Sequence, residues 1–202
     1  RGNHPGIIDY KGKSYCFGLT YDLFRLESSR HAERRSVSAA EMTYNADGTI
    51  KELPYFQDCK LEQIGTFNPY RRVEAETMAW GYGLKTTREN PSGPWNETLF
   101  VTDIDDGEYI LVRGIDFGKK GALKFHVSCS SQLYGGRMEI RLDAVDGSLA
   151  GAIDIPNTKF KYREFITDVT QCNGVRDVYF VFKSTSIQKK NLFNFDWWKF
   201  DK

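Results

Sequence analysis

The chain has 202 residues, a formal net charge of +1, 40% hydrophobic residues and 14% aromatic residues. This composition can fill the core of one large domain, or of one domain with an attached fragment, and it excludes a wholly disordered chain. The balanced charge excludes the electrostatic footprint of a nucleic-acid-binding protein, and no apolar run approaches the roughly 20 residues of a membrane span.

The N-terminal part alternates apolar and polar residues with a period of two, which indicates β-strands. The strands are predicted at residues 6–10, 14–19, 34–44 and 49–53. Residues 45–48, Asn-Ala-Asp-Gly, are typical of a hairpin connection between the last two. The periodicity is then lost, so we predict a first domain at 1–66, a linker at 67–72 and a second domain at 73–202.

The second domain contains many short strand patterns separated by Asp-Gly, Gly-Gly and Asn-Gly turn signals. The strands are predicted at residues 73–78, 99–103, 108–117, 123–130, 137–143, 151–155, 163–169, 178–183 and 193–200. Short strands at this spacing, without a long helical pattern, indicate an all-β fold with a β-sandwich, and we expect a jelly roll.

Five segments of the second domain occur in an order that resembles a family 6 carbohydrate-binding module. They are "VEAETMAWGYG", "VTDIDDGEYILVRGIDFG", "MEIRLDAVDGSLAGAIDIPNT", "VRDVYFVF" and "LFNFDWWKF". The resemblance implies binding of a plant cell-wall polysaccharide, xylan or arabinoxylan, and therefore an extracellular location.

The N-terminal part resembles the last blade of the five-bladed β-propeller of glycoside hydrolase family 43. That resemblance implies that about four further blades precede Arg1 and complete an arabinofuranosidase or xylosidase. It also implies that His4 faces the propeller centre, and that Arg34 or Arg35 contacts the sugar there. Glycoside hydrolysis needs a pair of carboxyl groups, and in this family they come from earlier blades. We therefore expect this chain to be inactive alone.

Glu74 and Glu76 lie two residues apart in a predicted strand, so their side chains are expected on one face. Like charges in that position repel unless a cation lies between them. The residues alone leave two interpretations open, a solvated acidic face or a cation site. The resemblance implies a structural calcium ion held by Glu74, Glu76 and Asp196, with backbone carbonyls completing the shell.

In the resembled family, two aromatic rings enclose a terminal sugar and an Asn of the last strand bonds its hydroxyls. Asn194 matches that Asn, and Tyr162 is the best match to one ring, with Phe160 as the alternative. The family's Thr-Gly-Gly before this ring is replaced here by Thr158-Lys159-Phe160.

The other ring is missing, because Asp103 stands where the family usually has Tyr. Trp95, in a loop with Pro and Gly, is a candidate to supply that second face. Trp197 and Trp198 are neighbours in a strand and point to opposite faces, so at least one must be core, and we interpret both as structural.

Three functions remain open from the sequence. The first is a non-catalytic polysaccharide-binding module with an attached blade. The second is the C-terminal part of an intact hydrolase, whose active site the blade helps to complete. The third is a sandwich that binds no sugar, a hypothesis favoured by Asp103.

Overall fold

The computed structural model describes residues 4–21, 36–59, 61–88 and 99–202, and its chain divides into two compact units. The blade unit is Arg1–Ile64 and the sandwich unit is Gly65–Lys202. Among the described residues, no helix is long and apolar enough to cross a membrane.

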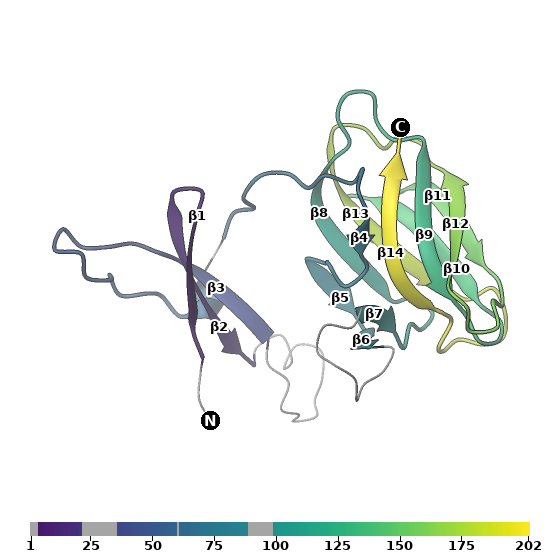
Figure 1. Cartoon of the computed structure of the whole chain (residues 1–202), viewed down its shortest axis with the longest axis horizontal. Coiled ribbons are helices and arrows are strands. Elements are labelled where there is room, and N and C mark those ends of the chain that lie inside the picture. Colours follow the sequence, from purple (N-terminus) through teal and green to yellow (C-terminus); the bar gives the residue numbers. More distant parts are fainter. Residues whose placement is uncertain (1–3, 22–35, 60, 89–98) are drawn as a thin grey trace. The chain divides into compact units, whose positions relative to one another are not determined.

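The blade unit is a three-stranded antiparallel sheet in the order β1-β2-β3 (Figure 1). Its strands are β1 (Gly6–Tyr10), β2 (Lys13–Thr20) and β3 (Ser36–Met42). The short 3-10 helix η1 (Phe56–Asp58) follows, and the Phe56 ring packs so closely on Gly18 that a Cβ atom there would lie 2.4 Å from the ring. This glycine therefore permits the contact between β2 and the helix.

The predicted strand at residues 49–53 is wrong. Residues 45–48 do form the expected turn, with Gly48 at a φ of +84° and its N–H donating to the Asn45 carbonyl. Beyond the turn only one bridge forms, between Tyr44 and Ile50. Pro54 follows at once and has no N–H to extend a ladder, and the chain enters η1 instead.

The sandwich unit packs two antiparallel sheets face to face (Figure 1). The five-stranded sheet has the order β11-β10-β13-β8-β5, with β11 (Ser148–Ile155), β10 (Gly136–Leu142), β13 (Val175–Lys183), β8 (Tyr109–Asp116) and β5 (Trp80–Tyr82). The six-stranded sheet has the order β12-β9-β14-β7-β6, with β12 (Arg163–Asp168), β9 (Lys124–Ser130), β14 (Asn194–Asp201), β7 (Leu99–Thr102) and β6 (Lys85–Arg88). Its sixth strand, β4 (Val73–Glu74), pairs with β14.

Aromatic side chains fill the space between the two sheets. Trp198 is fully buried and meets Phe180 of the opposite sheet edge-on, with ring centroids 5.2 Å apart. Phe125 and Phe200 are buried beside them. The predicted core role of the tandem tryptophans is thereby confirmed for Trp198, and the predicted all-β fold with a sandwich is confirmed for the whole unit.

Residues 67–72 are not a spacer, because they pack on the sandwich. The Phe67 N–H donates to the Gly114 carbonyl at 2.8 Å, and the Phe200 N–H donates to the Pro69 carbonyl at 2.9 Å. The Tyr70 hydroxyl donates to the Phe117 carbonyl at 2.7 Å. The rings of Phe67 and Tyr70 pack against the core, although the sequence of this segment has no periodicity that would predict it.

Two strands, β5 and β6, were not predicted, and β4 is shorter than predicted. The predicted strand 73–78 ends at Glu74, because residues 75 and 76 form a turn closed by the Thr77 N–H on the Glu74 carbonyl. Glu76 therefore lies in a turn, and the argument that placed it on the same strand face as Glu74 is wrong.

Candidate functional site

A row of polar side chains crosses the outer face of the six-stranded sheet, the face turned away from the core, at the end where β7 and β9 finish. Asn194, the first residue of β14, pairs with Ser130 of β9. Its amide oxygen accepts a hydrogen bond of 2.8 Å from the Thr102 hydroxyl of β7. That bond fixes the amide plane and leaves the NH2 group to donate, since no acceptor for it is found among the described residues.

Two aromatic rings flank this row. Tyr162 directly precedes β12, and Phe100 lies two residues before Thr102 on the same face of β7. The two rings meet edge-on with centroids 5.8 Å apart, and Tyr162 is 37% exposed. The structure thus brings the predicted Asn194 and Tyr162 to one region and adds Phe100, which the sequence reasoning missed. Its signal was the alternation of Leu99–Thr102, which turns Phe100 and Thr102 outward together.

The loop that carries Tyr162 keeps the backbone conformation of glycine without containing glycine. Lys159 and Phe160 have φ angles of +55° and +62°, values that favour glycine because side chains rarely adopt them. The loop is held by Ser131, whose carbonyl accepts the N–H groups of Thr158 and Phe160 and whose N–H donates to the Thr158 hydroxyl at 2.9 Å. The Tyr162 position is therefore set by backbone hydrogen bonds.

Asp103, predicted to stand in place of an aromatic residue, forms an ion pair. Its carboxylate lies 2.9 Å from the Lys85 ammonium group, and both side chains are about half exposed. Lys85 pairs directly with Thr102, so the ion pair extends the polar row by one strand. This pair could not be predicted from the sequence, because Lys85 lies in a strand, β6, that was not predicted.

The three predicted metal ligands lie around one cation, the guanidinium of Arg72. Arg72 donates two hydrogen bonds to Glu74, at 2.9 and 3.0 Å, and lies 3.7 Å from Asp196. Burial, and then the charges of Glu74 and Asp196, raise the pKa of the Glu76 carboxyl, and one of its oxygens is buried without a hydrogen-bond partner. In the described part of the chain, no three acidic, His or Cys side chains are arranged as a ready metal site.

A second aromatic group lies on the outer face of the five-stranded sheet. Tyr82 and Tyr109 are stacked at 5.5 Å with an interplanar angle of 16°, and Tyr179 follows at 5.8 Å from Tyr109. Tyr82 is half exposed. Flat exposed rings of this kind offer faces on which a pyranose ring can stack.

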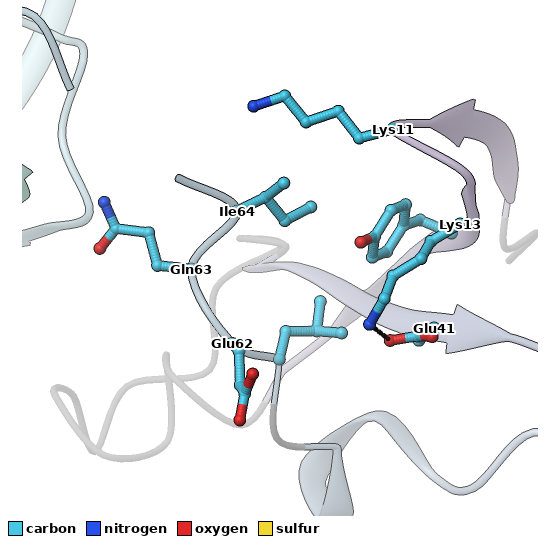
Figure 2. Close-up of a pocket in the computed structure, with 8 residues that line it drawn as sticks. Lys11, Lys13, Glu41, Glu62, Gln63 and Ile64 are labelled. Carbon is cyan, nitrogen blue, oxygen red and sulfur yellow. Dashed lines mark hydrogen bonds and ion pairs between the residues drawn. The ribbon is translucent and has the colours of Figure 1, made fainter. Parts of the chain in front are cut away.

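The blade unit contains a polar pocket of about 500 Å³ (Figure 2). Its lining residues are Lys11, Lys13, Tyr15, Glu41, Leu61, Glu62, Gln63 and Ile64. Lys13 and Glu41 form an ion pair of 2.8 Å, drawn in Figure 2. Among the described residues of the lining, Tyr15 is the one aromatic residue, and it is only 5% exposed.

The remaining predicted residues do not join these groups. His4 is exposed just before β1. Trp95, Arg34 and Arg35 lie outside the described residues.

The sequence profile of the carbohydrate binding module (family 6) matches residues 74–202, nearly the whole sandwich unit. The chain belongs to carbohydrate-binding module family 6. The five ordered segments of the sequence predicted a family 6 module in this part of the chain, and the match confirms that prediction.

The comparisons also cover the blade unit. An arabinoxylan arabinofuranohydrolase of Bacillus subtilis (strain 168) is 42% identical over 169 residues, 82% of this chain and 32% of that protein. A crystal structure of a glycoside hydrolase family 43 arabinoxylan arabinofuranohydrolase from Bacillus subtilis, in complex with cellotetraose, matches with a TM-score of 0.85 and 36% identity. That match covers 100% of this chain and 41% of the other. The chain thus spans about a third of the length of the curated relative.

A family 6 module from Clostridium cellulolyticum, in complex with xylose, matches with a TM-score of 0.59 and 30% identity. It covers 67% of this chain and 100% of the other chain. The module alone therefore accounts for two thirds of the chain. The predicted propeller-blade fragment is confirmed by the match to the family 43 hydrolase, which extends over the whole of this chain.

Proposed function

We propose that the sandwich unit binds xylan or arabinoxylan at the row formed by Thr102 and Asn194, beside the contacting rings of Tyr162 and Phe100. The observation that carries this proposal is the Asn194 amide, fixed by Thr102 with its NH2 group left to donate, beside an exposed aromatic ring. A sugar offers hydroxyl groups to such a donor and an apolar C–H face to such a ring. Because the polymer lies outside cells, we also propose an extracellular protein.

Affinity electrophoresis on arabinoxylan tests this proposal. Asn194→Ala leaves a sugar hydroxyl unpaired in a partly desolvated site, at a cost of about 1–3 kcal/mol, or about 5- to 150-fold in affinity. Tyr162→Ala and Trp95→Ala are expected to weaken retardation as well. Lys124→Ala, on the same sheet face at its other end, is the matched control.

The outcomes separate the site from its alternatives. If Asn194→Ala and Tyr162→Ala migrate like the parent, while Tyr82→Ala or Tyr179→Ala loses retardation, the polymer binds on the five-stranded sheet. If the parent is retarded on no xylan or glucan, the third hypothesis, a sandwich that binds no sugar, replaces this one.

We further propose that the whole protein is a family 43 hydrolase acting on arabinoxylan, in which the blade unit packs against further blades and His4, with Arg34 or Arg35, lies at the central pocket. The full-length match to an enzyme of that family supports this, as do the exposed apolar residues Ile8, Tyr10 and Val37 on the blade sheet. The test is the intact mass of the protein isolated from its source, with arabinose release from arabinoxylan. A native polypeptide of the present length would refute it.

We also propose that Glu74, Glu76 and Asp196 hold a structural calcium ion. The unpartnered buried oxygen of Glu76 and the mutual repulsion of the three carboxylates support a cation at this place. Calcium binding would require Arg72 to leave Glu74, and carbonyl oxygens to complete six to eight ligands. The ion would stabilise the fold and would take no part in sugar binding.

A further inference from the structure

The ion pair of Lys85 and Asp103 lies directly beside the proposed sugar site. Lys85 is the pairing partner of Thr102, and Thr102 is bonded to Asn194, so three neighbouring strands place these side chains in one row. The Lys85 ammonium group and the Asp103 carboxylate lie 2.9 Å apart at the end of that row.

The segments next to the two members of this pair are in close contact. Gly83, at a φ of +84°, precedes Lys85 by two residues, and a Cβ atom there would lie 2.0 Å from a carboxylate oxygen of Glu108. The other oxygen of Glu108 accepts the Asp105 N–H at 2.8 Å and so closes the turn after Asp103. Asp103 itself has a φ of +53°, a conformation that costs a non-glycine residue free energy and that the turn must impose. The pair is therefore held in place from both sides.

Stability does not account for this pair. The two side chains are 53% and 48% exposed, and exposed ion pairs contribute little to folding. What remains is hydrogen-bonding capacity. The ammonium group has three N–H donors and the carboxylate about four acceptor positions, and their mutual bond uses one of each.

We propose that the Lys85–Asp103 pair binds two adjacent hydroxyl groups of the sugar whose other side rests on Tyr162 and Asn194. One hydroxyl accepts from the ammonium group, and its neighbour donates to the carboxylate. The module thus holds its ligand by a ring on one side and by hydroxyl recognition on the other, where the family uses a second ring. Because the charges of the pair balance, the ligand is a neutral sugar with a vicinal diol, such as xylose. This inference rests on the proposed binding site.

Isothermal titration with a soluble neutral xylo-oligosaccharide tests the inference in the full chain. Lys85→Met keeps the length of the side chain without its donors, and Asp103→Asn keeps a residue that tolerates a positive φ. Each is expected to weaken binding about tenfold or more, since hydrogen bonds to charged groups are the stronger ones. The matched control is Lys124→Met, at the exposed 2.7 Å pair of Lys124 and Asp168 on the same sheet, which should bind like the parent.

Three results would overturn the inference, and the first two of them would leave the proposed function intact. If Asn194→Ala abolishes binding while Lys85→Met and Asp103→Asn stay within twofold of the parent, the site is correct and the pair is outside it. If a glucuronic-acid-bearing xylan binds more tightly than the neutral oligosaccharide and Lys85→Met removes the difference, Lys85 binds a carboxylate. If the parent binds neither ligand, the proposed function fails together with the inference.

Discussion

The replacement Glu76→Gln separates the free-energy cost of the acidic group from its proposed role in calcium binding. Without metal, the buried oxygen of Glu76 lacks a partner, and Glu74 and Asp196 disfavour its charge. Leaving such a group unsatisfied costs about 1–3 kcal/mol. The uncharged amide removes the repulsion and can donate to a neighbouring carboxylate. In chelator, Glu76→Gln should therefore melt above the parent by about 3–12 °C, at about 3–4 °C per kcal/mol for a unit of this size.

In calcium the order should reverse. An ion that binds only the folded state adds about 2.7 kcal/mol at a concentration of 100 Kd, which raises the parent's melting temperature by about 8–11 °C. Glu76→Gln lacks one charged ligand and should gain far less. The parent should thus have the lower melting temperature of the two proteins in chelator and the higher one in calcium.

The assay is thermal melting of the full chain followed by near-ultraviolet circular dichroism, in which the buried Trp198 reports on the sandwich unit. The control is Asp168→Asn, an exposed carboxylate whose replacement should leave the calcium response unchanged. A parent that melts at one temperature with and without calcium would refute the metal site. A Glu76→Gln protein less stable than the parent in chelator would refute the reasoning about the buried oxygen.

Three further changes test the packing. Phe160→Gly should stabilise the sandwich unit by about 0.5–1 kcal/mol in urea unfolding, because glycine adopts the positive φ freely. A lower stability of the variant would mean that the Phe160 ring makes stabilising contacts with the rest of the unit. Trp198→Ala should lower the free energy of unfolding by about 3–5 kcal/mol and abolish the cooperative melt. Trp197 is half-buried beneath the Arg72 guanidinium, and Trp197→Ala should lower that free energy by about 1 kcal/mol. Equal losses of stability in the two variants would contradict the assignment of Trp198 to the core. Residues 1–64 alone should show no cooperative thermal unfolding, because three strands with one covered face offer little core; a monomer with a sharp transition would contradict this.

The sandwich was predictable where a long strand alternates over its whole length, as β10 does. Buried and half-buried side chains alternate along residues 136–142, and the sequence alternates between apolar or small residues and charged ones at the same positions. The strands that were missed, β5 and β6, have three and four residues, too few for a period to appear. Residues 67–72 were misjudged as a linker because three aromatic or proline contacts, without periodicity, carry no local signal.

The candidate site divides in the same way. Asn194 and Tyr162 were predicted from the resemblance to family 6 modules, in which an Asn of the last strand and an aromatic ring bind the sugar. Asn194 begins β14 and Tyr162 directly precedes β12, two strands that the alternation of the sequence predicts. The pair of Lys85 and Asp103 was not found, since it joins the start of β6 to the residue after β7, beside the close approach of Gly83 to Glu108. Such a contact results from tertiary packing, and the residue pattern around Lys85 or Asp103 does not predict it.

The loop at Lys159 and Phe160 holds a backbone conformation that favours glycine, although neither residue is glycine. Two adjacent non-glycine residues at positive φ carry a cost of about 1–2 kcal/mol each, which must be offset by other contacts. Ser131 supplies them, through its N–H and carbonyl, and its hydroxyl donates to the Leu192 carbonyl two residues before Asn194. One buried serine thus connects the segment that carries Tyr162 to the segment that carries Asn194. The two segments are thus joined through the backbone of Ser131 and Leu192 and through the hydroxyl groups of Ser131 and Thr158.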